Sequence, residues 1–393
     1  MINVAFFHQR FLVQAEAIAA LKHTPGVRVV VIDIMDSPSK DQSLEVCRAL
    51  DNQKCSLLFT INDWGMDNEG EIAAHCAKNG TIHINWCVDD PFFMEIFHGR
   101  PIMPASNRLD FVSNRAYVAP MRERGLNAHF LPLAADPAIF FPPAEAPPYA
   151  RDLCFVGNSY RKQIDEFCSS CEGLMERLVP FMGDVLHRYE RNMLIDLERE
   201  VAAELDGQTL PPSLSKRKAT FIVKHFISYL FRKRTVCSLA REFPGFVVFG
   251  DPFWKCDLPD EKVSTTVGYY ANLRDTYVRT KINIDINRVV ITEGLTQRVF
   301  DCSACGGFII TNNKSIINEF FETKTVEKEL VTFDNERHLK DLINHYLMNE
   351  EERLAIARRA QKKVLGEHTY DHRMRTIFKI LSEQMNQALH YPA

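Results

Sequence analysis

The sequence predicts an α/β protein built from two doubly wound domains, with a helical insertion in the second domain. Three observations lead to this prediction. Short apolar, β-branched runs alternate with helical patterns in both halves of the chain, which is typical of parallel sheets covered on both faces. A proline-rich stretch separates the two halves, and a long helical segment interrupts the second alternation. A length of 393 residues suits two or three domains.

The first domain is expected over residues 1–135, as one Rossmann-like unit. Its predicted strands are Val4–Phe7, Val27–Ile34, Leu57–Ile61, Ile82–Val88, Phe111–Ser113 and His129–Leu133. Helical patterns lie between them at Leu12–Lys22, Ser43–Asp51, Glu69–Lys78 and Arg115–Arg124. Buried runs that alternate with helices indicate parallel strands joined by crossover helices.

Prolines mark the segment that follows. They are Pro132, Pro137, Pro142, Pro143, Pro147 and Pro148. Proline fixes φ and lacks an amide donor, so this stretch forms neither regular helix nor central strand. We interpret residues 136–150 as an interdomain linker.

The second domain is expected over residues 151–370. Its predicted strands are Leu153–Val156, Val247–Gly250, Ser264–Val267, Ile282–Ile286, Phe308–Thr311 and Leu330–Phe333. Its predicted helices are Leu273–Thr280, Leu295–Ala304, Ser315–Phe321, His338–Met348 and Glu350–Leu365, and a further helix, His372–Leu389, closes the chain. The interruption at about 160–243 is predominantly helical, with a break at Asp206–Ser215. It is several times longer than an ordinary crossover, so we interpret it as an insertion.

Composition excludes several classes of protein. Hydrophobic residues make up 46% and charged residues 25%, which argues against disorder and fibrous repeats. A net charge of −4 gives no indication of a nucleic-acid partner. No run reaches the roughly 20 apolar residues of a membrane span, and the N-terminus does not resemble a signal peptide. We expect a cytoplasmic protein.

The eleven cysteines are scattered, which is typical of reduced thiols. Two CxxC pairs occur, Cys168/Cys171 and Cys302/Cys305, and neither has a second pair at zinc-ribbon spacing. The sequence therefore predicts no bound metal and no cofactor.

Ligands of such folds bind beyond the carboxyl ends of the strands, against helix N-termini. After the strand at 282–286, Glu293 and Asp301 are eight residues apart, and a helix begins between them. The Asp301 carboxylate suits a vicinal diol such as ribose. The helix N-terminus and Arg298 suit phosphate. The alternative is a solvated helix with ordinary charges.

The loop after the strand at 153–156 is a second candidate. It carries Gly157, Asn158, Ser159 and Arg161, and a glycine turn followed by an arginine is a plausible contact for a diphosphate. No complete GxGxxG or Walker pattern is present. A surface role for Arg161 is the alternative.

The first domain offers acid–base candidates. Asp89 and Asp90 follow the strand at 82–88, where a carboxylate can orient or deprotonate an acceptor hydroxyl. Adjacent carboxylates also bind metals, or cap a turn before a residue such as Pro91. His8 follows the first strand and faces the same edge of the sheet, although a lone histidine is more often structural.

These motifs resemble a known family. The segment from Val267 to Thr311 resembles the nucleotide-sugar half of the GT-B glycosyltransferases, whose retaining, group-1-like members carry two acids separated by seven residues. Glu293 matches the first acid, and Asp301 replaces the usual second glutamate. The chain is more closely similar to the CgeB-like spore-maturation glycosyltransferases, through CVDDPF (87–92), LPLAADPAIF (131–140), CFVGNSYR (154–161), TQRVFDCSACGGFIIT (296–311) and HTYDHR (368–373).

The resemblance implies a fold and an activity. The fold is GT-B, in which two Rossmann-like domains face each other across a cleft and the C-terminal helix, residues 371–393, packs back on the first domain. The activity is transfer of a sugar from a UDP-, GDP- or dTDP-linked donor to an acceptor hydroxyl on a surface glycan, a lipid-linked glycan or a protein. Transfer is expected to be retaining and, without a DxD-like pair near the donor, independent of metal.

The resemblance also implies roles for individual residues. Asp301 would hold the ribose, Glu293 would lie beside the donor sugar or diphosphate, and an aromatic face would stack on the base. The expected phosphate contacts are Gly294, Leu295 and Thr296, and the expected base contacts are Tyr269 and Tyr270. Ordinary core or surface tyrosines are the alternative for the last two.

Two questions stay open at this level. The basic segment Lys216–Arg234 fits either contact with an anionic membrane surface, which would make the protein peripheral at the inner face, or a helix packed within the insertion. A nucleotide-sugar epimerase of the same fold, or a sugar- or nucleotide-binding protein without turnover, would share much of the donor pocket.

Overall fold

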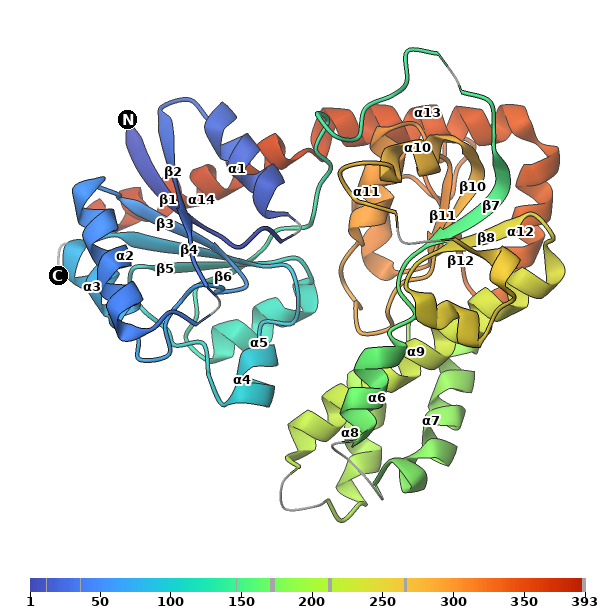
Figure 1. The fold of residues 1–393 in the computed structure, drawn as a ribbon, viewed down its shortest axis with the longest axis horizontal. Coiled ribbons are helices and arrows are strands. Elements are labelled where there is room, and N and C mark those ends of the chain that lie inside the picture. Colours follow the sequence, from blue (N-terminus) through green and yellow to red (C-terminus); the bar gives the residue numbers. More distant parts are fainter. Residues whose placement is uncertain are drawn as a thin grey trace. The chain divides into compact units, whose positions relative to one another are not determined.

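The computed structural model describes residues 1–390, apart from residues 12, 36, 146, 170–173, 211–213 and 265–266. Cys171, the Pro211-Pro212 pair and part of the strand expected at 264–267 lie outside the described residues. The chain divides into two compact units, each of which is described by itself (Figure 1). The first combines Met1–Asp136 with Glu367–Ala393, and the second is Pro137–Gly366.

The first unit contains a six-stranded parallel sheet in the order β2-β1-β3-β4-β5-β6. The strands are β1 (Ile2–His8), β2 (Val27–Asp33), β3 (Leu57–Ile61), β4 (Ile82–Cys87), β5 (Arg108–Val112) and β6 (Ala128–Phe130). All six were predicted. The strand predicted at Phe111–Ser113 begins three residues earlier, at Arg108, because a buried polar network hides its first residues from an apolar pattern.

Helices cover both faces of this sheet. They are α1 (Gln14–His23), α2 (Lys40–Asn52), α3 (Glu71–Asn79), α4 (Phe93–His98), α5 (Val118–Glu123) and α14 (Tyr370–His390), with a 3₁₀ turn η1 (Arg115–Tyr117) before α5. Side chains of α1 and α14 share one core with the sheet, whereas α2 and α3, and separately α4 and α5, form cores on the other face. The short helix α4 was not predicted.

The C-terminal helix α14 is part of the first unit, although more than 200 residues separate it from β6 (Figure 1). Met374, Ile377 and Leu381 are buried in the core beneath the sheet. Arg373 donates to the carbonyl oxygens of Pro132 and Leu133 at 2.8 Å. The helix therefore ties the end of the chain to the segment that leaves β6.

The second unit contains another six-stranded parallel sheet, in the order β12-β11-β10-β7-β8-β9. The strands are β7 (Arg151–Val156), β8 (Phe246–Phe249), β9 (Val263–Ser264), β10 (Thr280–Asp285), β11 (Ile309–Asn312) and β12 (Val331–Phe333). Two doubly wound parallel sheets confirm the predicted fold class.

Helices and 3₁₀ turns surround this second sheet. They are α10 (Leu273–Val278), α11 (Gln297–Ala304), α12 (Glu336–Met348), α13 (Glu350–Glu367), η2 (Pro252–Cys256), η3 (Asp260–Lys262) and η4 (Ser315–Glu319). The helix predicted at Ser315–Phe321 is thus a 3₁₀ turn.

The predicted insertion is helical and branches from β7 (Figure 1). It comprises α6 (Arg161–Ser169), α7 (Leu174–Arg191), α8 (Leu197–Asp206) and α9 (Lys216–Glu242), and the other three pack against α9. The apolar side chains of α9 are buried within the unit. Four of its cations pair with acidic groups: Lys216 with Asp206, Lys224 with Glu198, Lys233 with Asp257 and Arg234 with Glu190. This favours a packed helix over a membrane-surface helix.

None of the helices within the described ranges has both the length and the apolar character that a membrane crossing demands.

We expect Ile377→Ala to lower the free energy of unfolding of the first unit by about 2–5 kcal/mol, because it leaves a cavity in a fully buried core. Lys379→Ala on the exposed side of the same helix is the control and should change little. Urea unfolding of both variants measures the difference. Equal stabilities would show that α14 does not contribute to the core of the first unit.

Candidate functional site

A buried carboxylate ends the central strand of the second sheet. Asp285 is the last residue of β10, and its side chain is inaccessible to solvent. It accepts hydrogen bonds from the Arg298 Nη1 and the Thr296 hydroxyl, both at 2.6 Å, and from the Thr311 hydroxyl at 3.0 Å. These donors belong to the start of α11 and to β11. Asp285 thus fixes the N-terminus of α11 to the carboxyl ends of two strands.

Four cationic side chains gather at this edge. They are Arg232 from α9, Arg288 after β10, Arg298 from α11 and Lys314 after β11. The guanidinium groups of Arg232 and Arg288 lie 4.7 and 5.4 Å from the ring centre of Tyr160. Arg298 lies 5.9 Å from the ring of Phe155, the residue before the end of β7. The carboxyl ends of β7, β10 and β11 therefore share one strongly cationic region.

Arg232 joins the two loops that lead out of β7 and β10. Its guanidinium donates to the carbonyl oxygens of Asn158 at 3.0 Å and Ile286 at 2.7 Å. The side chain is 1% exposed, and its Nε has no partner among the described residues. Burial, together with the neighbouring cations Arg298 and Arg288, lowers the pKa of Arg232 to about 10, against the opposing effect of Tyr160.

The pKa values of two other groups in this region are also shifted. Burial alone would raise the pKa of the Tyr160 hydroxyl, but Arg288, Arg232 and Arg298 together lower it to about 8. Burial lowers the pKa of Lys314 to about 7, against the attraction of Asp285. The ammonium of Lys314 donates to the Gly294 carbonyl at 3.2 Å. Clustered cations with perturbed pKa values are typical of a site that binds an anion.

The loop after β7 is held from several sides. Ser159 donates its amide and hydroxyl to Asp251 at 2.6 and 2.8 Å, and the Trp254 indole donates to the Gly157 carbonyl at 2.9 Å. A Cβ on Gly157 would approach the Phe155 ring to 2.7 Å and the Arg298 Nη2 to 3.2 Å, so only glycine fits beside the arginine. Tyr160 adopts φ +64°, a strained conformation.

Arg161, which the sequence nominated as a phosphate contact, lies on α6. It pairs with Asp165 at 3.0 Å on the exposed face of that helix. The cations that the structure brings together at the carboxyl ends of the strands therefore do not include Arg161. Of the two arginines that the sequence predicted for phosphate, only Arg298 is among them.

Asp301 and Tyr269 are joined on the other side of α11. The Tyr269 hydroxyl donates to Asp301 Oδ2 at 3.0 Å, and Gln297 Nε2 donates to Oδ1 at 2.9 Å. Asp301 is 1% exposed, whereas Tyr270 is exposed and packs edge-on against Tyr269 at 4.9 Å. The two residues predicted for ribose and base thus lie together, with the carboxylate turned toward protein donors.

The segment before α11 contains four residues that the sequence predicted for the site, some of them buried and one half-buried. Glu293 is half-buried. Gly294 accepts from Lys314, Leu295 is buried and the Thr296 hydroxyl is bonded to Asp285. This segment is consequently part of the cationic region.

The predicted first-unit residues lie at the carboxyl edge of the first sheet. His8 Nδ1 is 2.8 Å from Asp33 Oδ1, across the ends of β1 and β2. Asp89 accepts from Asn62 at 3.0 Å. Asp90 accepts from the Phe92 amide at 2.9 Å, a turn-capping bond before α4. His8 and Asp89 are thus held by neighbouring strands, and Asp90 caps the turn before α4.

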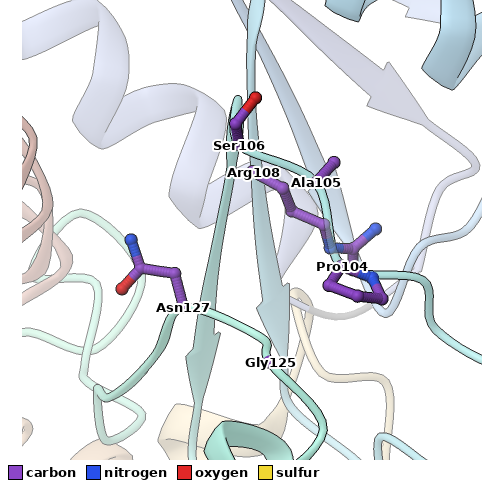
Figure 2. Close-up of a pocket in the computed structure, with 6 residues that line it drawn as sticks. All are labelled: Pro104, Ala105, Ser106, Arg108, Gly125 and Asn127. Atoms are coloured by element: carbon purple, nitrogen blue, oxygen red, sulfur yellow. The ribbon is translucent and has the colours of Figure 1, made fainter. Parts of the chain in front are cut away.

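A cavity of about 360 Å³ in the first unit lies elsewhere (Figure 2). Arg108, at its wall, donates to Asp110 at 2.6 Å and to Asp63 at 2.7 Å, and those carboxylates raise its pKa against the effect of burial. The other lining residues are Pro104, Ala105, Ser106, Gly125 and Asn127. Arg108 begins β5 and Asn127 precedes β6, so the cavity is at the amino ends of the strands, away from the usual ligand edge.

Metal-binding clusters of three or more His, Cys, Asp or Glu side chains are absent from the described part of the chain. Cys302 and Cys305 are buried in α11 and directly after it, and burial raises the pKa of both thiols. Cys305 Sγ donates to the Cys302 carbonyl at 3.3 Å, which makes this pair part of the helix packing.

Sequence reasoning missed Asp285, Arg232, Arg288 and Lys314. Asp285 is the last residue of β10, and Arg288 follows it by three residues. Lys314 similarly follows β11. The rule that functional residues follow strands could have found these three. Arg232 gave no such signal, because it lies in the middle of a helix of the insertion.

Comparisons with known proteins agree with this architecture. Residues 232–379 match the model of a family described as glycosyl transferase-like, and this range contains all four cations. A comparison of the sequence with curated proteins finds no match. The structure is similar to Anabaena HepE in complex with UDP-glucose, with a TM-score of 0.58 and 10% identity over 98% of this chain and 100% of that chain. HepE in complex with UDP and glucose gives a TM-score of 0.55 at 9% identity with the same coverage.

At such low identities the likeness to HepE shows the fold alone, which is the GT-B fold that the sequence resemblance implied. The family match covers residues 232–379, less than half of the chain, and shows that this part is similar to the glycosyl transferase-like family.

Asp285→Asn should lower the free energy of unfolding by about 3–5 kcal/mol, because it removes the charge that compensates a buried arginine. Asp165→Asn is the matched control. It breaks an exposed pair and should cost no more than about 1 kcal/mol. Chemical denaturation of the two variants decides the matter, and similar losses would mean that Asp285 does not organise the site.

Proposed function

We propose that this protein is a glycosyltransferase that moves a sugar from a nucleotide-diphosphate sugar to an acceptor hydroxyl. The observation that carries the proposal is the cluster of Arg232, Arg288, Arg298 and Lys314 at the carboxyl ends of β7, β10 and β11. A diphosphate is the common ligand whose charge and size suit several cations at that edge of a doubly wound sheet.

The chemistry follows from where charge develops. The bond between the sugar C1 and the diphosphate oxygen breaks, and its electron pair leaves with the nucleoside diphosphate. The acceptor oxygen forms the new bond to C1, and its proton passes to a base. Fixed cations stabilise the growing negative charge on the leaving group without rearranging during the step. A divalent metal is unnecessary in this scheme.

The remaining roles follow the sequence analysis. Asp301 and Tyr269, which lie together, are proposed to meet the ribose and the base, with Tyr270 at the entrance. Glu293 is proposed to act beside the donor sugar. In the first unit, Asp89 or His8 is proposed to orient or deprotonate the acceptor. Retention of configuration and membership of the CgeB-like group rest on the sequence resemblance alone.

UDP is the nucleotide to test first, because the HepE structures named above hold UDP or UDP-glucose. The acceptor hydroxyl is proposed to belong to a surface glycan, a lipid-linked glycan or a protein.

Thermal unfolding with millimolar UDP, GDP, dTDP, CDP and CMP, each with and without EDTA, tests the donor site. We expect one diphosphate to raise the melting temperature irrespective of EDTA. A ligand at a hundredfold excess over its Kd stabilises the native state by about 2.7 kcal/mol. Arg288→Gln should abolish most of the shift, whereas Arg241→Gln on the exposed end of α9 should keep it. No shift with any nucleotide would overturn the proposal.

Product analysis with the responsive UDP-, GDP- or dTDP-sugar then separates the alternatives. Transfer or hydrolysis of the donor indicates a transferase, and an altered nucleotide sugar indicates an epimerase. Glu293→Gln should lower turnover by at least about a hundredfold while nucleotide affinity stays within a few-fold, because the residue is proposed to act on the transition state. Nucleotide binding without any turnover would indicate a binding protein.

The affinity for UDP-glucose should fall about tenfold between pH 6 and pH 8, because Lys314 loses its charge at a pKa of about 7. Both phosphates of UDP-glucose are diesters and stay ionised over this range. Calorimetric titration at several pH values measures the effect. Lys314→Met should bind more weakly and flatten the profile, Lys281→Met is the control, and Tyr160→Phe removes the other group that titrates nearby.

The same group gives the free protein a pH dependence of opposite sign. The pKa of Lys314 in the folded protein is below the ordinary lysine value of 10.5, so the unfolded chain binds more protons between about pH 7 and 10.5. The free energy of unfolding therefore rises with pH in that window, and Lys314→Met should remove this rise. An unchanged profile in the variant would contradict the assignment.

A further inference from the structure

An aromatic pair lies at the carboxyl edge of the first sheet. Phe11 follows β1 and Trp64 follows β3, two strands that are neighbours in the sheet. Their ring centres are 4.4 Å apart, with an angle of 45° between the planes. Phe11 is 47% exposed and Trp64 is half-buried. The pair therefore offers an apolar surface to solvent on the edge where ligands of this fold bind.

Unpaired amide atoms belong to Gln9, in the loop after β1, and to Gln14, the first residue of α1. Gln14 Oε1 accepts from the backbone amides of Gln9 at 2.8 Å and Phe11 at 3.4 Å, while Gln14 Nε2 has no partner among the described residues. Both side-chain amide atoms of Gln9 are likewise buried and unpaired within the described structure. A buried amide without a partner is unfavourable, so such atoms are rare unless a ligand or water meets them.

The two loops are also strained. Six non-glycine residues of the described chain have positive φ, and four of them are here: Arg10, Val13, Asn62 and Asp63. Val13, at φ +75°, is β-branched, for which this conformation is unusually costly. Asn62 joins the Trp64 loop to Asp89, because its amide donates to that carboxylate at 3.0 Å. Strain of this kind persists where the surrounding structure fixes a functional arrangement.

We propose that this edge binds the acceptor, and that the acceptor group held here is a saccharide. A sugar ring has an apolar C–H face that suits Phe11 and Trp64. Its hydroxyls both donate and accept, which suits the paired donor and acceptor atoms of Gln9 and the donor of Gln14. A lipid chain would leave these amides unpaired, and an anionic head group would approach the carboxylate of Asp89. The assignment as acceptor rests on the proposed transferase activity.

Trp64 provides the measurement, because Trp86 and Trp254, the other two tryptophans, are buried. Acrylamide quenching of the full chain is titrated with maltotriose, cellotriose and N,N′,N″-triacetylchitotriose, and in parallel with a short-chain polyprenyl phosphate and a Ser/Thr hexapeptide. We expect at least one trisaccharide to protect Trp64 saturably, whereas the lipid phosphate and the peptide do not.

Variants separate binding from structure. Phe11→Ala should weaken protection at least tenfold, and Phe141→Ala is the matched control in the second unit, with 46% exposure. Gln9→Leu should weaken saccharide binding and raise the melting temperature, because it removes buried polar atoms without partners. A purely structural role for Gln9 would not give changes of opposite sign.

The proposal is overturned if no trisaccharide protects Trp64, or if only the polyprenyl phosphate or the peptide does. UDP binding is measured on the same samples. If UDP binds but no trisaccharide protects Trp64, the saccharide inference is wrong and the proposed transferase function is unaffected. Saccharide protection without binding of any nucleoside diphosphate supports the saccharide site and overturns the transferase function.

Discussion

The hydrogen bonds of Asp285 are the constraint on which the second unit depends. One buried carboxylate at the end of the central strand holds the start of α11, the end of β11 and the guanidinium of Arg298. Without this charge, Arg298 would be buried beside two further arginines and a lysine. Their mutual repulsion and loss of hydration are unfavourable, and packed apolar residues would serve stability better. An anion bound here, as proposed above, would offset both costs.

The helical insertion is part of this arrangement. Arg232 reaches from the middle of α9 to the carbonyl oxygens that follow β7 and β10, and Ser228 accepts the Val289 amide at 3.0 Å from the same helix. The remaining insertion helices bury the apolar face of α9 and pair its charges. The insertion thus braces the two loops around the cationic region, which explains why a segment so long can interrupt an α/β unit between two neighbouring strands.

The sequence predicted the fold well because strands of a parallel sheet are nearly continuous apolar runs. The prediction was wrong about where β5 begins, because polar residues interrupt the apolar run there. Strand β5 begins at Arg108 and contains Asp110. The buried ion pair between these two residues interrupts the apolar pattern. The site was predicted in part for a related reason. Glu293, Arg298 and Asp301 share one motif, whereas Asp285 and Arg232 owe their importance to three-dimensional contacts. Arg161 was a candidate because it follows a strand, yet an i,i+4 partner holds it at the surface.

Both units keep their uncompensated groups at the same edge of a sheet. In the second unit these are cations, which a diphosphate would neutralise. In the first unit they are amide atoms and a partly exposed aromatic pair, which a neutral polyhydroxylated ligand would complete. Strained backbone accompanies both, at Tyr160 and at the loops around Phe11 and Trp64. Each feature is unfavourable in the free protein, and the proposed ligands would offset that cost. Cations at one edge and neutral polar groups at the other would favour different ligands, in keeping with the proposed donor and acceptor.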